Sequence, residues 1–348
     1  MANPQEKQSV KQHVLAPAAL LLGSSLFCLV LLEVGFRVFS ALSVPPPEWS
    51  DRPGHYYFQE GAVNYQDYIY SKQKPPGTFR IAVVGDSFTY GEKLQNDDTL
   101  PKRLERFLNL NSAQPKIEVM NFGVPGYSTR NEVRLARQAI ASWDVDLVLL
   151  QITLNDPELI PKSAADLNRD ETGKLAIRQP IFEYWKSLGF VLERLNNSAS
   201  HEDYQEYFFN LFTNRKTWKN FRAGLDEFSD AVRKRNRQVF AFVFPLLSHP
   251  LDERYPFMPL HQKIASQLEA NKIPYLDLFP AFSGIPEDRL VVEPGKDRHP
   301  NEIANRIAAE ALLLALAKTD LIPAAAFPKH TQPHKLPLPA LTRGRAFE

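Results

Sequence analysis

The sequence predicts an α/β fold, a three-layer sandwich of about five parallel strands, preceded by one N-terminal transmembrane helix. Strand-like apolar runs alternate with helix-like segments along the chain. The runs are apolar almost throughout, which is typical of parallel strands covered by helices on both faces. An uncharged apolar stretch near the N-terminus predicts the membrane span.

The elements alternate in a regular order. Short apolar runs predict strands at residues 79–85, 116–122, 145–153, 238–247 and 274–279. Helical spacing of apolar residues predicts helices at 99–110, 129–143, 255–271 and 300–318. Such alternation favours right-handed crossovers, so the predicted fold is a flavodoxin-like sandwich. In such sheets ligands bind outside the carboxyl ends of the strands.

The connection between the third and fourth strands, residues 157–236, is much longer than a crossover needs. We expect a helical, aromatic-rich insertion. Its aromatic residues are Phe182, Tyr184, Trp185, Phe190, Tyr204, Tyr207, Phe208, Phe209, Phe212, Trp218 and Phe221. Two interpretations stay open. The aromatic side chains pack on the domain, or the insertion forms a lid or substrate groove, since it leaves the sheet where ligands bind.

The N-terminal segment decides the topology. Residues 15–32, LAPAALLLGSSLFCLVLL, carry no charge. About 20 helical residues span the hydrocarbon layer, so residues 15–42 are predicted to be an uncleaved transmembrane anchor. The alternatives are a cleaved signal peptide and a buried core helix, but no clear A-x-A site follows and the run has no polar stripe. Lys7 and Lys11 favour a cytoplasmic N-terminus at residues 1–14, with the remaining chain outside the cytoplasm.

Proline-rich segments bound the predicted domain. Residues 43–54 are predicted to be a stiff Pro-rich linker. The domain then covers residues 55–320, and we find no internal repeat in it. Residues 321–348 have prolines every few positions and no periodicity, so they are predicted to be a disordered Pro-rich tail.

Composition excludes several classes of function. The 348 residues include 41 Lys plus Arg and 40 Asp plus Glu, so there is no basic excess that would indicate a nucleic-acid partner. The single cysteine, Cys28, excludes an intramolecular disulfide and a cysteine-based zinc site. His330 and His334 have the spacing of zinc ligands on a helix, but Pro333 lies between them, and no metal is predicted. No strand is followed by G-x-G-x-x-G or a P-loop, so no nucleotide cofactor is predicted.

Four polar motifs are expected at one edge of the sheet. Ser87 lies in GDSFTYG, directly after the first strand, and NFGVPGYST, residues 121–129, follows the second. TLND, residues 153–156, ends the third strand, and DRHPN, residues 297–301, precedes the last helix. The carboxyl ends of parallel strands meet at one rim, so these motifs should lie together. The G-x-S-x-G motif of ordinary α/β-hydrolases is absent.

Together these motifs resemble those of the SGNH (GDSL) hydrolase superfamily. The resemblance covers about residues 55–320 and is greatest to membrane-anchored bacterial members. It implies that Ser87 is a nucleophile and that His299 is its base. It implies an oxyanion hole made of the backbone amides of Ser87 and Gly126 and the side-chain amide of Asn155. It also implies that the protein uses no metal and no organic cofactor.

The catalytic acid departs from the family's pattern. The usual Asp-x-x-His spacing falls on Lys296, whereas Asp297 gives Asp-x-His. Residues two apart in an extended segment face the same side, so Asp297 is predicted to orient the imidazole of His299. The remaining candidates, His249 and His261, are expected to be structural or substrate-facing residues.

Several neighbours of these residues receive supporting roles. The resemblance, through the spacing within the second motif, implies that Gly126 rather than Gly123 is the glycine of the oxyanion hole. Thr153 replaces the family's first glycine in the third motif, which alters the turn. Asp86 is expected to cap the helix that follows or to brace its turn. Asp156 is expected to orient nearby loops, without a catalytic role.

The resemblance implies a membrane-tethered extracytoplasmic serine esterase that hydrolyses O-acyl esters, such as acetyl esters on an envelope glycan. The expected partners are an acyl-ester substrate, on a glycan or a lipid, and the membrane. The expected location is the bacterial inner membrane, single-pass, with the catalytic domain in the periplasm or outside the cell. Two alternatives remain: an O-acyltransferase that uses the same residues, with a sugar hydroxyl in place of water, and a catalytically silent binding module of the same fold. The sequence predicts no oligomeric state.

Overall fold

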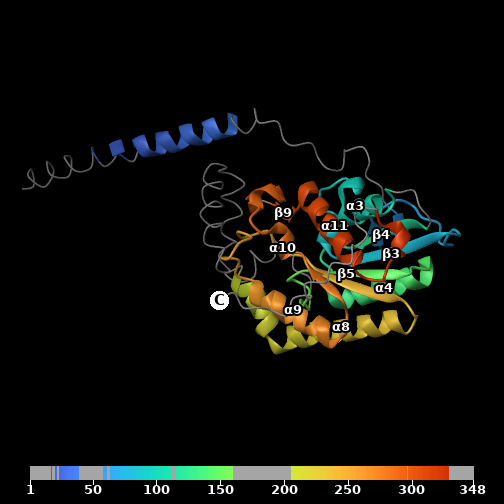
Figure 1. The fold of residues 1–348 in the computed structure, drawn as a ribbon. Coiled ribbons are helices and arrows are strands. Elements are labelled where there is room, and N and C mark those ends of the chain that lie inside the picture. The colour runs from blue at the N-terminus through green and yellow to red at the C-terminus, as the bar shows by residue number, and fades with distance from the viewer. Residues whose placement is uncertain are drawn as a thin grey trace, which may run out of the picture. The chain divides into compact units, whose positions relative to one another are not determined.

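A computed structural model describes residues 17, 20–21, 23–38, 58–60, 63–110, 115–159, 205–295 and 297–328 (Figure 1). The chain divides into two compact units. Of the described residues, those up to 38 belong to the first unit and those from 58 onward belong to the second.

The described part of the first unit is helical over residues 23–38. Most apolar side chains of this helix are exposed, and Glu33 and Arg37 form an ion pair of 2.7 Å along it. Within the described ranges, no helix reaches the length and apolarity that a membrane crossing requires. The predicted anchor, residues 15–42, lies partly outside those ranges, and the predicted linker, residues 43–54, lies wholly outside them.

The second unit contains a five-stranded parallel sheet, which confirms the α/β class and the five parallel strands that the sequence predicts. Its strands are β3 (Thr78–Gly85), β4 (Lys116–Gly123), β5 (Leu147–Ile152), β6 (Gln238–Val243) and β7 (Tyr275–Asp277). Their order across the sheet is β4-β3-β5-β6-β7. The central strand positions are fully buried, as expected for strands that are covered on both faces.

Helices cover both faces of this sheet. They are α3 (Leu100–Leu108), α4 (Thr129–Trp143), α8 (Arg215–Arg233), α9 (Met258–Ala270) and α11 (Glu302–Leu316). In Figure 1, α3 and α11 lie above the sheet, whereas α4, α8 and α9 lie below it. The backbone N–H of Leu100 donates to Asn305 Oδ1 at 2.9 Å and joins α3 to α11. On the other face Arg130 of α4 pairs with Glu227 of α8 at 2.6 Å.

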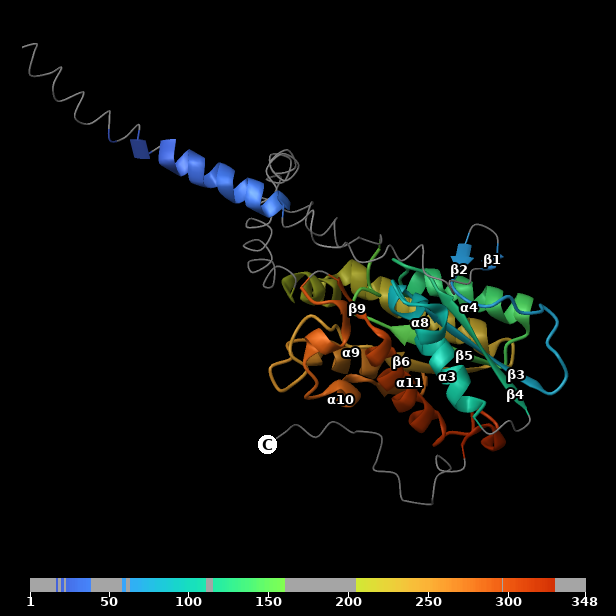
Figure 2. The same cartoon turned by 90° about the horizontal axis from the view of Figure 1, so that it is seen from above.

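Short elements complete the unit. A hairpin of β1 (Phe58–Glu60) and β2 (Val63–Tyr65) precedes the sheet (Figure 2). The short helices are α2 (Ser87–Tyr90), η2 (Asn96–Asp98), α10 (Phe279–Phe282), η4 (Glu287–Arg289) and η5 (Ala324–Ala326). β8 (Val291–Glu293) pairs antiparallel with β9 (Asp297–Pro300). This second hairpin, which the sequence did not predict, carries Asp297 and His299.

The long connection contains an ordinary crossover helix. Helix α8 lies between β5 and β6, inside the segment predicted as a helical insertion at residues 157–236. Phe212 and Phe221 are fully buried, and Trp218 stacks on Phe221 with ring centroids 5.4 Å apart. The described aromatic residues therefore agree with packing on the domain. Residues 160–204, with the other predicted aromatic residues, lie outside the described ranges.

The predicted tail begins too early. Residues 321–328 are described, and Ile322, Ala326 and Phe327 are each at most 3% exposed. A segment without helical or strand periodicity can still bury apolar side chains, and here their burial fixes its path. The domain therefore extends to residue 328. The rest of the predicted tail lies outside the described residues.

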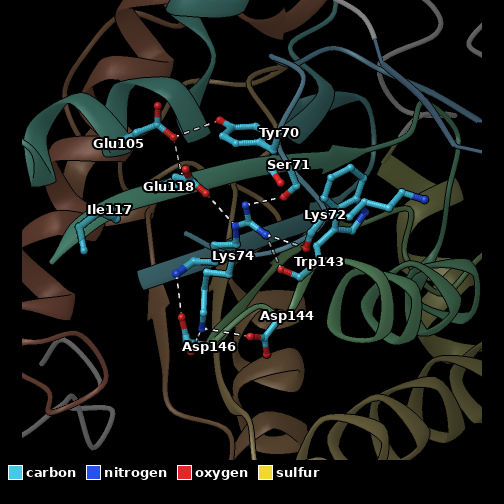
Figure 3. A network of polar contacts seen from close by, with 12 residues as sticks. Tyr70, Ser71, Lys72, Lys74, Glu105, Ile117, Glu118, Trp143, Asp144 and Asp146 are labelled. Atoms are coloured by element: carbon cyan, nitrogen blue, oxygen red, sulfur yellow. Dashed lines mark hydrogen bonds and ion pairs between the residues drawn. The ribbon is translucent and has the colours of Figure 1, made fainter. Parts of the chain in front are cut away.

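A buried charged network holds the amino ends of the strands (Figure 3). The Arg80 side chain, on β3, is fully buried and pairs with Glu118 of β4 at 2.7 Å. Its terminal nitrogens donate to the backbone oxygens of Ser71, Lys72 and Trp143 at 2.6, 3.2 and 2.8 Å. This network lies at the opposite end of the strands from the predicted site.

Candidate active site

Ser87 is the first residue of α2, at the point where β3 ends. Asp86 caps this helix, because its carboxylate accepts the backbone N–H of Phe88 at 2.9 Å. The capping role predicted for Asp86 is confirmed. The short turn from strand to helix places the Ser87 hydroxyl at the carboxyl edge of the sheet.

The structure brings Ser87, His299 and Asp297 into one hydrogen-bonded row. Ser87 Oγ lies 2.9 Å from His299 Nε2. On the other side of the ring, Nδ1 lies 2.7 Å from Asp297 Oδ1. The same carboxylate oxygen also accepts the backbone N–H of His299 at 3.0 Å. The Asp-x-His spacing therefore brings the Asp297 carboxylate to the His299 imidazole, because both residues lie in the extended strand β9. Lys296 lies outside the described residues.

The environment shifts the pKa of both members of this pair. Burial would raise the pKa of Asp297, but hydrogen bonds from His299 and from Lys93 hold it well below its usual 3.8. Burial would lower the pKa of His299, but the hydrogen bond and charge of Asp297 raise it above 6.5. The carboxylate is therefore ionised at neutral pH, and the imidazole is a stronger base than a free histidine.

Lys93 is a member of this site that the sequence analysis missed. Its Nζ lies 2.6 Å from Asp297 Oδ2, the carboxylate oxygen that faces away from the imidazole. The one indication in the sequence that Lys93 lies near the site is its position six residues after Ser87. The contact joins the turn after α2 to β9, which no local pattern could reveal.

The second motif forms a tight turn at the end of β4. The backbone N–H of Tyr127 donates to Val124 O at 3.1 Å, and Gly126 has φ +75°. That positive φ, after Pro125, is typical of a type II turn and suits glycine. Gly123 has a different function, since a Cβ there would come within 2.1 Å of the Tyr90 backbone nitrogen. Gly123 thus permits close packing, while Gly126 shapes the turn; the oxyanion-hole role of Gly126 stays a prediction.

The third motif is tied directly to the first. The Asn155 side-chain amide donates to Asp86 Oδ2 at 3.2 Å, and Thr153 Oγ1 donates to the same oxygen at 2.8 Å. Thr153 also contacts the Asn155 side-chain oxygen. Thr153, where the resemblance leads one to expect glycine, therefore does more than alter the turn: its hydroxyl links the ends of β3 and β5.

Two more carboxylates are buried behind these loops. Asp156 Oδ2 accepts the backbone N–H of Thr153 at 3.1 Å, which confirms that Asp156 orients this loop. Glu132 is fully buried, and its carboxylate has no hydrogen-bond partner among the described residues. Burial, with the charge of Asp86, raises the pKa of Glu132 well above 4.5. Burial, with the charges of Glu132 and Asp86, likewise raises the pKa of Asp156 well above 3.8.

The other histidines have partners away from Ser87. His261 is buried and contacts Asp277 at 2.9 Å. His249 contacts Ser248 Oγ and Gln205 Nε2, each at 2.9 Å. These contacts agree with structural roles. Within the described ranges no group of His, Cys, Asp and Glu could hold a metal ion, and the tail histidines lie outside those ranges.

Comparison with known proteins identifies a family. The model of the GDSL-like Lipase/Acylhydrolase family matches residues 83–307, well over half of the chain. The match includes Ser87, Gly126, Asn155, Asp297 and His299. A search of the curated proteins finds no match.

Solved structures with a similar chain path come from several bacteria. The psychrotrophic esterase EstA from Pseudoalteromonas sp. is 13% identical, with a TM-score of 0.41 over 69% of this chain and 97% of that chain. The lipase/acylhydrolase from Enterococcus faecalis is 13% identical, with 0.41 over 68% and 95%. A catalytic mutant of Axe2, an acetylxylan esterase from Geobacillus stearothermophilus, is 14% identical, with 0.42 over 70% and 96%. At such values the similarity concerns the chain path alone.

Proposed function

This chain belongs to the GDSL-like lipase/acylhydrolase family and is an enzyme that hydrolyses ester bonds; from that premise we propose that it is a serine esterase acting on O-acyl esters through Ser87, His299 and Asp297. The observation that carries the proposal is the row of two contacts, 2.9 Å from Ser87 to His299 and 2.7 Å from His299 to Asp297. An uncharged imidazole at that distance can take the serine proton.

Each residue of the row has a defined step. Ser87 Oγ attacks the ester carbonyl carbon while His299 Nε2 takes its proton. Asp297 holds the proton of Nδ1 and stabilises the imidazolium that forms. His299 then gives its proton to the leaving alcohol, which departs from an acyl-Ser87 intermediate. Water attacks that intermediate with His299 again as base, and the carboxylic acid is released.

The developing negative charge on the carbonyl oxygen needs donors. We assign this role to the backbone amides of Ser87 and Gly126 and to the side-chain amide of Asn155. Loss of one such donor typically costs about 10²–10³ in rate. The hydrogen bond from Asn155 to Asp86 supports this assignment, because it holds the amide beside the residue that precedes Ser87.

The proposal extends to location. The uncharged run at residues 15–32 and the preceding lysines support a single N-terminal anchor with the enzyme outside the cytoplasm. Envelope glycans or lipids that carry acyl groups, such as acetyl groups, are then the substrates within reach. An alkaline phosphatase reporter fused after residue 60 should be active in a bacterial periplasm. Activity of a cytoplasmic reporter alone would contradict the orientation.

Release of acetate from p-nitrophenyl acetate tests the reaction. The wild-type chain should hydrolyse the ester and react with a fluorophosphonate probe, and Ser87→Ala should do neither while staying folded. The same assay with a glycan acceptor separates hydrolysis from acyl transfer, since a transferase would move acetate to the sugar. No reaction of either kind in a folded wild-type chain would contradict the proposal and favour the silent binding module over it.

A further inference from the structure

We propose that Lys93 is a positioning residue of this site, which holds the Asp297 carboxylate against His299 and offsets its charge. The inference rests on the proposed function and deepens it. The nearest alternative is a structural ion pair that fastens the turn after α2 to β9 without affecting the reaction.

The first argument is how the carboxylate divides its hydrogen bonds. Asp297 Oδ1 accepts both the backbone N–H and Nδ1 of His299, at 3.0 and 2.7 Å. Its other oxygen, Oδ2, faces Lys93 Nζ at 2.6 Å. No other donor in the described part of the chain contacts Oδ2. Asp297 and His299 lie on the same strand, β9. Lys93, on the turn after α2, is therefore the residue that holds the Asp297 carboxylate from outside this strand.

The second argument is the fixed geometry of the turn that carries Lys93. Helix α2 ends at Gly91, with φ +81°, whose backbone N–H donates to Ser87 O at 3.1 Å. Leu94 is buried, and its backbone N–H donates to Gly91 O at 2.9 Å. Between them Lys93 has φ +60°, a conformation that is costly for a residue other than glycine. Costly backbone conformations often occur at functional sites, where surrounding contacts hold them.

The third argument is electrostatic. The Asp297 side chain is 13% exposed and that of His299 is 31% exposed, so their charges are poorly screened. Asp297, Glu92 and Asp86 all favour the protonated ring of His299. A protonated ring cannot take the Ser87 proton. The Lys93 cation opposes these three carboxylates, and Glu293 is the further acidic group that acts on Lys93 itself.

Replacing Lys93 separates the two interpretations. Lys93→Met removes the charge and keeps the length of the side chain, Lys93→Gln is a second neutral variant, and Lys93→Arg keeps the charge. Lys74→Met is the matched control, since Lys74 forms an ion pair of 2.7 Å with Asp146 at the opposite end of the strands. A structural ion pair would change the melting temperature in every neutral variant and leave the pH profile unchanged.

The readouts are the pH profile of kcat/KM on p-nitrophenyl acetate and the pKa of His299 from an NMR titration of its ring. Loss of the cation favours the protonated ring, so the acid limb should move to higher pH. We expect a shift of at least about 0.3 pH unit, the effect of one unit charge at roughly 10 Å in water, and the poor screening at this site should make it larger. We also expect a lower kcat in both neutral variants. Lys93→Arg should restore the profile, and Lys74→Met should match the wild type.

An acid limb and a ring pKa that stay unchanged, or move down, in both neutral variants would overturn the role of Lys93. The NMR titration needs no substrate, so it decides this point even if the esterase proposal fails. That failure would appear separately, as hydrolysis at the wild-type rate in Ser87→Ala.

Discussion

The side-chain amide of Asn155 donates to the carboxylate of Asp86, with nitrogen and oxygen 3.2 Å apart. The two residues lie on different loops, after β5 and after β3. The other oxygen of Asp86 caps α2 at Phe88 N. One buried carboxylate thus fixes both the helix that begins with Ser87 and the amide that we assign to the oxyanion hole.

Asp86→Ala should therefore lower both stability and activity. Loss of the helix cap costs about 1 kcal/mol. Release of Asn155 should lower kcat by up to about 100-fold, because a misplaced catalytic group loses its orientation. Asn214→Ala is the matched control, since the Asn214 side chain caps α8 by accepting Lys216 N at 2.8 Å. It should lose similar stability, measured by urea unfolding, and keep kcat. Equal kcat values in the two variants would remove Asp86 from the site.

The bounds of the strands and of α4 were predicted close to the observed ones, because apolar runs and helical spacing are local properties of a sequence. The predicted helix 129–143 has the bounds of α4. The fourth strand was predicted four residues too long, since its apolar run continues past Pro245, which cannot donate to a strand ladder.

Contacts between distant segments could not be predicted in the same way. Lys93 and Asp297 are in contact although most of the domain's sequence separates them, and the hydrogen bond from Thr153 to Asp86 joins two loops. Their residue types are common in surface turns. The motifs nevertheless pointed to Ser87 and His299, because together they resemble those of a known family and each was expected at the same rim of a parallel sheet.

The acid at Asp297 can be tested against its nearest rival. Asp297→Asn should lower kcat by about 10²–10⁴, because the amide favours the wrong tautomer of His299. His299→Ala should cost more, since the base itself is lost, although oxyanion stabilisation remains. Glu293→Gln, in β8, is the control and should be near neutral. A loss in Glu293→Gln that exceeds the loss in Asp297→Asn would mean that Glu293 is the acid. No loss in either would indicate a Ser–His dyad.

The buried Glu132 predicts a pH-dependent stability. Burial and the charge of Asp86 raise its folded-state pKa well above 4.5, so the unfolded chain releases this proton more readily. The contribution of Glu132 is therefore favourable below about pH 4.5 and is lost as the pH rises towards the folded pKa. Glu132→Gln should raise the melting temperature at about pH 8 and change it little at about pH 5. Glu310→Gln, on the exposed face of α11, is the control. An equal gain at both pH values would contradict the raised pKa.

The Arg80 network should contribute to stability and not to catalysis. Arg80→Met leaves Glu118 buried at 7% exposure without its cation, a loss of about 3–5 kcal/mol. Arg80→Met with Glu118→Leu should recover part of that loss, because no unpaired charge remains. The network lies at the amino ends of the strands and Ser87 at a carboxyl end, so kcat/KM per probe-labelled site should match the wild type.

Urea unfolding of these variants measures the free energy of unfolding. The comparison is Arg306→Met, which breaks an exposed ion pair with Glu310 and should cost less than about 1 kcal/mol. If Arg80→Met cost no more than that, the buried guanidinium would not hold the start of the sheet. If it lowered kcat/KM of the folded enzyme, the two ends of the strands would be coupled. The difference between the two arginines follows from burial, since the Arg80 side chain is fully buried and bonds to Glu118 and three backbone oxygens, whereas the Arg306 side chain is 64% exposed.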